Sequence, residues 1–403
     1  PKALLMAGGL VFLFALIPGF PKPQLFTLAA LLGGLGYVLK RVNETPQAPD
    51  AKEELSKSLT PTARPKSRPG AARDEFAPTV PISLDYASLN EELANLRRAL
   101  YFDLGVPFPG INIRPNPGLP ELSYVLNVNE IPMSRGKLEK GMVLARDTSE
   151  NLSMLGVEFK LGERFLPDVE PLWVPESKAA SLERVGISIM NHARILAYHL
   201  SLLLARHASS FLGMQESKYL LDKMEERAPD LVREATRLLP TQRIAEIFQR
   251  LVQEQISIRD LRSILEALIE WSPKEKDTVM LTEYVRSALK RQISYMYSKG
   301  QNMLPAILLD PSVEETIRKA IRQTSAGAFL ALDPDTTQRF LRAVTESAGK
   351  YTTNTQKPVL MASMDIRRYV RRLIEGEHYG LPVVSYQEVT PEISIQPVSR
   401  IRL

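Results

Sequence analysis

Three of the four histidines lie close together in the sequence and are the first residues to consider for chemistry. His192 and His199 are seven residues apart and His207 follows eight residues later, so one helix would place all three on a broad face. A metal site or a proton relay needs carboxylate or imidazole partners, and none stands three or four residues from these positions. We therefore expect histidines of a core or an interface, with a metal site or a relay as the alternative.

The sequence lacks the short motifs that bind nucleotides or catalytic metals. It contains no G-x-x-x-x-G-K-[ST], no G-x-G-x-x-G after a strand and no H-E-x-x-H. It has no cysteine, which excludes disulfides, thiolate metal sites and a catalytic thiol. We expect no catalytic residue, no metal, no cofactor and no enzyme activity. The alternative, a membrane-bound hydrolase, would need a nucleophile and a base in one pocket.

Two arginine clusters raise the question of nucleic-acid binding: Arg259 with Arg262, and Arg367, Arg368, Arg371 and Arg372. On a helix, the second cluster would cover one side while apolar residues cover another, which is typical of an amphipathic surface helix. The clusters lack the repeated interleaving of aromatic side chains that marks a base-stacking platform. We expect a solvated face or a protein contact, and nucleic-acid binding remains the alternative.

The composition is that of a globular protein with a mildly basic balance. Of 403 residues, 44% are hydrophobic, and 51 Lys and Arg stand against 46 Asp and Glu, a formal net charge of +5. The apolar content excludes a wholly disordered or collagen-like chain, and the length allows about two to four globular units. The net charge is too small to indicate a polyanion partner by itself.

Two uncharged apolar runs, residues 3–20 and 25–39, open the chain. Each is near the lower limit of about 17 residues for crossing a bilayer, so we predict two transmembrane helices within residues 1–41. Lys40 and Arg41 follow directly, which favours a cytoplasmic position for the rest of the chain. A cleaved signal peptide is the alternative, although two runs without an A-x-A exit argue against it. The first residue is Pro1, so we expect a processed chain or a fragment.

Small residues in the second apolar run indicate how it packs. Gly33, Gly34 and Gly36 would let helix backbones approach closely, as in a packed transmembrane bundle. Ordinary tolerance of glycine in membrane helices is the alternative reading of these three positions.

Residues 42–79 have the composition of a flexible linker. They are rich in Pro, Ala, Ser, Thr, Lys and Glu and carry few large apolar side chains that could offset the entropy of ordering. A basic cluster within them (Arg64, Lys66, Arg68 and Arg73) would either touch anionic lipid headgroups or remain solvated.

The remaining sequence predicts an α+β region. Alternation at 80–84 and strand-like runs at 111–114 and 122–128 flank a leucine-striped helix that starts with Ser88 and Glu91 as a capping box. Residues 189–272 follow a helical period almost throughout. Beyond them, apolar segments each precede a helix, and two of those helices open with Asp310-Pro311 and Asp333-Pro334, which indicates an α/β module over 273–403.

Four stretches match one protein family in the same order along the chain: Leu-Leu-Gly-Gly-Leu-Gly-Tyr at 31–37, Leu-Gly-Met-Gln-Glu at 212–216, Ile-Ser-Ile-Arg-Asp-Leu-Arg-Ser-Ile-Leu-Glu at 256–266 and Pro-Val-Val-Ser-Tyr-Gln-Glu at 382–388. The sequence resembles the export-gate proteins of bacterial type III secretion systems, the FlhA/InvA/SctV family. The last stretch resembles the virulence-injectisome branch more than the flagellar branch.

The resemblance implies a bacterial inner-membrane protein whose cytoplasmic region has four subdomains and forms a nonameric ring. The subdomains would be 80–125 with 170–188, an inserted 126–169, the all-helical 189–272 and the α/β module 273–403. The ring would dock chaperone–substrate complexes and order their export. Its partners would include other inner-membrane export proteins, the secretion ATPase and the stalk, and no nucleic acid. Proton-coupling residues would lie upstream of this sequence.

The resemblance also indicates a docking cleft between the first two subdomains. Flagellar relatives use a D-x-x-F motif there, and the aligned stretch in this sequence runs from Gly162 to Phe165, so the aromatic is kept and the acid is missing. We expect Phe165, Leu172 and Trp173 to line this cleft, with an ordinary core position for Phe165 as the alternative.

Charged residues at the start of one helix are the expected ring interface. Arg259, Asp260 and Arg262 would pair across a subunit boundary, and a solvated helix start with Asp260 as a first-turn acid is the alternative. The alternative function for the whole chain is a membrane-tethered protein that binds nucleic acid or anionic lipid.

Overall fold

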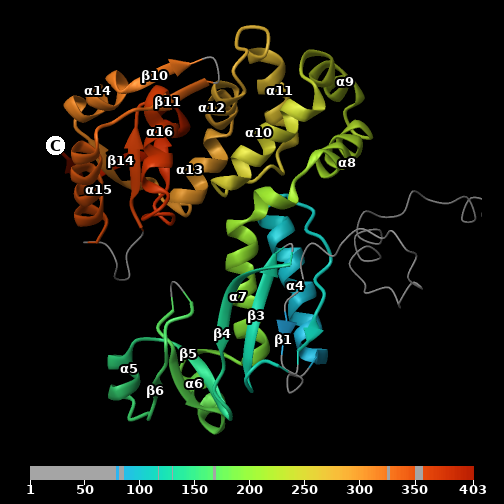
Figure 1. Ribbon diagram of the computed structural model, residues 1–403, viewed down its shortest axis with the longest axis vertical. Helices are drawn as coiled ribbons and strands as arrows, with labels where there is room; N and C mark the ends of the chain where they lie inside the picture. The colour runs from blue at the N-terminus through green and yellow to red at the C-terminus, as the bar shows by residue number, and fades with distance from the viewer. Residues whose placement is uncertain are drawn as a thin grey trace, which may run out of the picture. The chain divides into compact units, whose positions relative to one another are not determined.

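The computed structural model describes residues 79–80, 86–116, 118–128, 130–166, 169–324, 327–349 and 357–403, which all fall within one compact unit (Figure 1). The predicted membrane spans, with Gly33, Gly34 and Gly36, and the linker up to residue 78 lie outside the described residues. Within the described ranges, no helix combines the length and the apolar character needed to cross a membrane.

The first sheet contains the strands β1 (Thr79–Val80), β2 (Arg114–Pro115), β3 (Ser123–Val128) and β4 (Ile131–Lys137), in the order β2-β1-β3-β4. On β3, alternate residues are buried, as the period of a half-covered strand requires. The helices α4 (Tyr86–Leu104) and α7 (His192–Arg206) pack on each other and lie beside this sheet (Figure 1). Ser88 lies inside α4, so the predicted capping box is wrong.

The second sheet is antiparallel and has the order β6-β7-β5-β8. Its strands are β5 (Met142–Arg146), β6 (Lys160–Leu161), β7 (Leu172–Pro175) and β8 (Ser188–Met190), with the helices α5 (Ser149–Met154), η1 (Glu176–Lys178) and α6 (Ala179–Arg184). Val143, Leu172, Val174 and Leu182 share a separate hydrophobic core here.

This pairing corrects the predicted boundaries of the first two subdomains. Residues 170–188 were assigned with 80–125, but β7 pairs with β5 and α6 packs into the same core. Residues 131–137 were assigned to the inserted subdomain, but β4 pairs with β3. The pattern of a short strand shows which of its faces is buried and does not show which strand lies next to it.

A run of helices follows, as the period of the sequence predicts. These elements are η2 (Ala208–Phe211), α8 (Met214–Glu225), α9 (Pro229–Leu238), α10 (Thr241–Gln253), α11 (Leu261–Trp271), α12 (Thr278–Ala288) and α13 (Lys290–Ser298). The helices are amphipathic, and Phe248, Leu251 and Ile264 are among the side chains that they bury completely.

The chain ends in a sheet of four parallel strands, β13-β12-β9-β14. Its strands are β9 (Met303–Leu309), β12 (Val359–Ala362), β13 (Val383–Ser385) and β14 (Ser394–Ile401), with the helices α14 (Pro311–Lys319), α15 (Pro334–Gly349), α16 (Met364–Ile374) and η3 (Tyr386–Glu388) and the hairpin β10 (Ile321–Thr324) and β11 (Gly327–Leu330). Asp310 caps α14 through the Ser312 amide, and Asp333 accepts from the Thr336 amide at the start of α15, so both predicted helix starts are confirmed.

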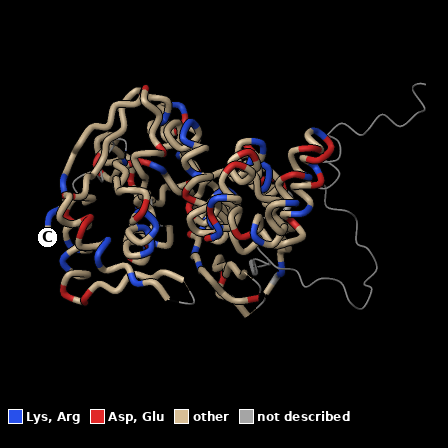
Figure 2. The backbone as a smooth tube through the Cα atoms, turned by 90° about the horizontal axis from the view of Figure 1, so that it is seen from above, with Lys and Arg blue, Asp and Glu red and all other residues tan. Residues whose placement is uncertain are grey.

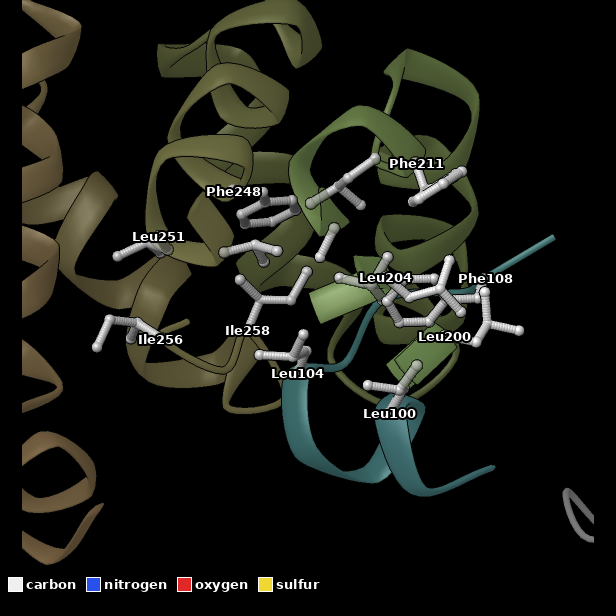
Figure 3. Close-up of a cluster of buried hydrophobic side chains, with 14 of the residues drawn as sticks. Leu100, Leu104, Phe108, Leu200, Leu204, Phe211, Phe248, Leu251, Ile256 and Ile258 are labelled. Carbon is white, nitrogen blue, oxygen red and sulfur yellow. The ribbon is translucent and has the colours of Figure 1, made fainter. Parts of the chain in front are cut away.

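The end of α4 packs closely against the helical run. The Ile258 amide donates to the Leu104 carbonyl at 2.9 Å, and Leu100, Leu104 and Ile258 pack into one apolar cluster (Figure 3). Between these contacts Gly105 has a φ of +78°, and a Cβ there would lie 3.0 Å from the Arg259 amide nitrogen. This position needs glycine because the backbone is left-handed and the neighbouring chain fills the space of a side chain.

We expect Gly105→Ala to lower the free energy of unfolding by about 1 to 3 kcal/mol through strain at the junction. Gly110→Ala is the matched control because an added Cβ there meets nothing within 4 Å. Urea titrations of both variants measure the difference, and equal stability of the two would contradict this account of the junction.

Candidate functional site

The histidines do not form a reactive group. His199 is buried, its Nδ1 lies 2.8 Å from the Tyr124 hydroxyl, and its Nε2 lies 2.8 Å from the Ser134 hydroxyl. His192 contacts the Glu139 carbonyl, and His207 ends α7. In the described part of the chain, no three acidic or histidine side chains are grouped so that they could hold a metal ion. His199 is therefore a hydrogen-bonded core histidine.

We expect His199 to make the fold sensitive to acid. Burial lowers the pKa of His199 from 6.5 to about 4, so the folded chain takes up this proton less readily than the unfolded chain. The contribution of neutral His199 to the free energy of unfolding is fully present above about pH 6.5. Up to about 3 kcal/mol of this contribution is lost as the pH falls towards 4. Thermal melts from pH 7 to 4 should fall more steeply for the natural chain than for His199→Gln. Parallel curves would argue against this role.

The three residues predicted to line a docking cleft have different environments. Phe165 is half-buried and stacks on Trp173, with a ring-centroid distance of 6.4 Å, and it also lies near His199. Leu172 and Trp173 are 0% and 2% exposed, because β7 is the second strand of its sheet and both its faces are covered. Of these three side chains, only Phe165 is exposed enough to contact a partner. Leu172 and Trp173 are core residues.

The three residues predicted for the ring interface are exposed, but they differ in the contacts that they make within the chain. Arg259 donates to the Phe102 carbonyl at 3.0 Å and lies over the Phe102 ring, so it ties α4 to the start of α11 within the chain. Asp260 is the N-cap of α11 and accepts from the Ser263 amide, so it precedes the first turn and is not the first-turn acid of the alternative reading. Arg262 pairs with Glu266 at 3.8 Å on the surface of α11.

The arginines of α16 do not form the solvated face that the sequence pattern indicates. Arg367 and Arg371 are 1% and 7% exposed, whereas Arg368 and Arg372 reach the surface. Arg371 donates to the carbonyls of Leu381 and Tyr379. Because the cluster is divided between core and surface, it forms no continuous basic face for nucleic acid.

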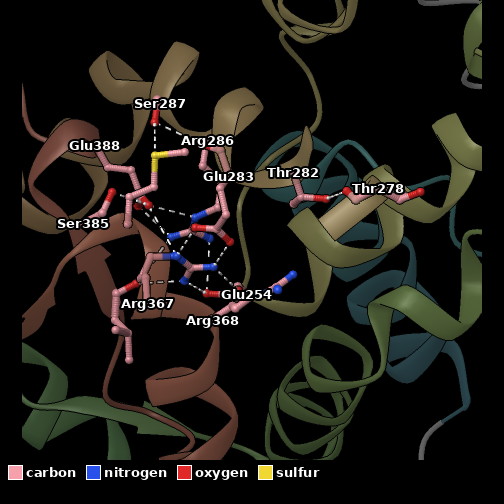
Figure 4. A network of polar contacts seen from close by, with 12 residues as sticks. Glu254, Thr278, Thr282, Glu283, Arg286, Ser287, Arg367, Arg368, Ser385 and Glu388 are labelled. Atoms are coloured by element: carbon pink, nitrogen blue, oxygen red, sulfur yellow. Dashed lines mark hydrogen bonds and ion pairs between the residues drawn. The ribbon is translucent and has the colours of Figure 1, made fainter. Parts of the chain in front are cut away.

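Arg367 belongs to a buried ion cluster that joins the helical run to the C-terminal sheet (Figure 4). Its guanidinium donates to Glu283 on α12 at 2.6 Å and to Glu254, the C-cap of α10, at 2.6 and 2.9 Å. Arg286, also on α12, donates to both carboxylate oxygens of Glu388, at 3.1 and 2.7 Å. We call Glu254, Glu283, Arg286, Arg367 and Glu388 the ion cluster.

Electrostatics keeps Glu254, Arg286 and Arg367 of the ion cluster charged. Burial alone would raise the pKa of Glu254, but the charges of Arg286 and Arg367 lower it to about 2. The pKa of Arg367 is raised despite its burial, because the carboxylates of Glu254 and Glu283 stabilise its charge. The arginines therefore remain protonated and Glu254 ionised at neutral pH.

The ion cluster is not predicted from the sequence, although part of its signal is visible there. Ser385 and Glu388 lie in a stretch quoted for the family resemblance, and the Ser385 hydroxyl donates to Glu388 at 3.0 Å. Glu283 and Arg286 are buried on α12, as are Leu281 and Val285. Charged residues in such positions indicate buried pairs, because an unpaired charge would be costly there.

A groove of about 1120 Å³ adjoins the ion cluster at Glu254. Its walls come from α10, the start of α12, α16 and the hairpin β10–β11, and Glu254 belongs to both the groove and the cluster. Acidic and basic side chains both line it, and the two signs are interspersed along the described chain as a whole (Figure 2). Such a surface suits a protein partner of mixed charge better than a polyanion.

The described residues thus form an α+β region in which Phe165 and the groove are surfaces suited to protein partners. The sequence pattern of the FHIPEP family matches residues 1–394, and the chain belongs to this family. It is 47% identical over 425 aligned positions to the low calcium response locus protein D of Yersinia pestis, covering 100% of this chain and 60% of that protein. The chain therefore spans about three fifths of the length of that curated relative.

Two solved structures share the fold. The Chlamydia pneumoniae CdsV protein, solved in complex with CdsO, is 42% identical with a TM-score of 0.77 over 81% of this chain and 97% of that one. The nonameric SctV-C of EPEC is 29% identical with a TM-score of 0.70 over 83% of this chain and 100% of that one. These similarities support the predicted export-gate family and its injectisome branch.

Proposed function

We propose that the chain is an export-gate component of a bacterial type III secretion apparatus. In this role its cytoplasmic region docks chaperone–substrate complexes and orders their export through an inner-membrane channel, without catalysing a reaction. The observation that carries the proposal is the family match along residues 1–394, supported by the shared fold of the nonameric SctV-C.

The assembly that fits this function is a nonameric ring attached to the bacterial inner membrane. Its partners are other inner-membrane export proteins, the secretion ATPase and the stalk, and the complex of the relative CdsV with CdsO supports a partner outside the ring. Residues 1–41 would then be the last two membrane helices and residues 42–79 the tether.

The described region fits a four-part organisation with boundaries that follow the sheets. The first sheet with α4 and α7 forms one part, and the second sheet forms the inserted part. The helices up to residue 272 would form the third part, and residues 273–403, with α12, α13 and the parallel sheet with its helices, would form the fourth. Chaperone docking would use Phe165, which lies where the inserted part meets α7.

A binding titration tests the function. The detergent-solubilised chain should bind a chaperone–substrate complex of the same secretion system, and its affinity should change little between 50 and 300 mM salt. Absence of binding would contradict the proposal. A steep fall in affinity for RNA or anionic vesicles with salt, without chaperone binding, would instead favour the polyanion-binding alternative.

Charge reversal at Arg262 should lower the abundance of rings. Arg262 is 65% exposed and could pair across a subunit boundary, where complementary charges set orientation. Native mass spectrometry of Arg262→Glu should show fewer rings with an unchanged circular dichroism spectrum. Lys274→Glu, which alters a comparable exposed pair with Glu270, is the control. Equal ring abundance in both variants would remove Arg262 from the interface.

A further inference from the structure

The strand β4 is an edge of the first sheet, so one of its sides has no neighbouring strand among the described residues. The Leu138 amide donates to the Leu122 carbonyl at 2.8 Å, which continues the antiparallel ladder of β3 and β4. Hydrogen-bonded positions alternate along such a ladder, and its register is regular over residues 134–137. The peptide N–H and C=O groups of Lys137 and Arg135 therefore point away from β3, towards the open side.

The inner face of β4 fixes the register of the strand. The Ser134 hydroxyl lies 2.8 Å from Nε2 of the buried His199. Gly136 is buried against the Tyr124 ring, which leaves no room for a Cβ at this position. A slip by one residue would turn an exposed basic side chain into this space. Arg135 and Lys137 are therefore held on the outer face of the strand.

The outer face of β4 carries two apolar side chains followed by two basic ones. Ile131 and Met133 are 60% and 42% exposed, and Arg135 and Lys137 are exposed as well. Within the part of the chain that the structure describes, neither basic side chain has an ion-pair partner. Side chains directly opposite each other on paired strands interact, and opposite charges stabilise the pair. A complementary strand would therefore place acids opposite Arg135 and Lys137.

The charges on β4 also exclude other occupants of this edge. Two copies of β4 side by side would bring four basic side chains together, and natural edge strands carry such charges to prevent pairing with one another. A polyanion would match the charges but would leave the peptide groups of Arg135 and Lys137 without a ladder and would not cover Ile131 and Met133. An extended acidic and apolar polypeptide satisfies the charges, the peptide groups and the apolar side chains together.

We propose that β4 binds an extended segment of a partner protein, which joins the first sheet as an additional antiparallel strand. The segment places acidic side chains opposite Lys137 and Arg135 and apolar side chains beside Met133 and Ile131. Its backbone forms up to about four hydrogen bonds with the free peptide groups of Arg135 and Lys137. Main-chain pairing supplies affinity and the alternate side chains supply specificity. This recognition is additional to the contact proposed for Phe165 and does not require it.

A designed peptide tests the backbone pairing. The acetylated peptide Glu-Thr-Glu-Thr-Val-Thr-Val places its two acids opposite Lys137 and Arg135 when it runs antiparallel to β4. Fluorescence anisotropy of the labelled peptide measures its binding to the detergent-solubilised chain. An N-methyl group on the second glutamate removes a donor that faces β4 and should weaken binding about tenfold or more. The same group on the first threonine, whose amide faces away from β4, should change the affinity by less than about twofold.

Charge reversal on β4 supplies the second arm of the test. Arg135→Glu combined with Lys137→Glu should weaken binding of the unmodified peptide about tenfold or more. Lys178→Glu combined with Lys218→Glu changes the net charge equally at exposed sites outside β4 and should leave the affinity unchanged. Thermal melts show that both double variants are folded.

Three results would overturn the strand addition: no binding of the peptide, equal weakening by the two N-methyl groups, or equal affinities of the two double variants. Rings that form normally and bind a chaperone–substrate complex without binding the peptide would reject the strand addition and leave the export-gate function standing. Loss of both kinds of binding would contradict the strand addition and the export-gate function together.

Discussion

Replacing Arg367 by leucine is expected to lower the free energy of unfolding by about 3 to 5 kcal/mol. The guanidinium is 1% exposed and donates to Glu254 and Glu283, so its removal leaves two carboxylates with too few positive partners in a water-poor site. A chain of this size should then melt roughly 5 °C lower. Circular dichroism of the melt measures the effect.

Two variants on the same helix control this experiment. Arg372→Leu removes an exposed guanidinium from the same helix and should change stability by less than about 0.5 kcal/mol. Arg367→Lys keeps the charge but loses the forked hydrogen bonds, so its loss should be intermediate. If Arg367→Leu has the same melting midpoint as the natural chain, the ion cluster does not stabilise the junction between the helical run and the C-terminal sheet.

Replacing Phe165 by alanine is expected to weaken binding of a chaperone–substrate complex about thirtyfold. Truncation of an aromatic hot spot typically costs about 2 kcal/mol or more in binding free energy, which gives that factor. Phe165 is half-buried, because one side of its ring packs on Trp173 and part of the side chain is exposed to solvent. Titration of the complex against the assembled ring measures the loss.

A thermal melt separates docking from packing in this variant. An unchanged midpoint with lost affinity supports a docking role for Phe165. A large drop in the midpoint shows instead that Phe165 stabilises the inserted part and that binding fails with the fold. Tyr295→Ala, which removes a 71% exposed aromatic on α13, is the control and should leave both quantities unchanged. Intact binding and an intact melt for Phe165→Ala would remove both roles.

Local signals in the sequence predict the parts of the fold that depend on neighbouring residues. Asp310 and Asp333 mark helix starts because an N-cap acid followed by proline satisfies the geometry of the first turn, and the structure places α14 and α15 there. The helical period over 189–272 is as reliable, since each helix buries one face. Asp260 shows the limit, because Ser257 and Asp260 are both N-cap types and backbone geometry decides between them.

The candidate sites depend on contacts between distant residues, and the sequence predicts them less well. Arg367 looks like part of a surface cluster until Glu283, 84 residues away, is seen to pair with it. The strand β7 looks like part of the first subdomain until its pairing with β5 is known. In both cases the local pattern is compatible with more than one partner, so the partner is found only in three dimensions.

The most direct test of the proposed export-gate function is a count of subunits in the assembled protein. Native mass spectrometry and averaged electron micrographs of the detergent-solubilised chain should show rings with nine subunits. A chain that remains monomeric at concentrations where the EPEC relative forms its nonamer, or that forms rings of another symmetry, would contradict the account.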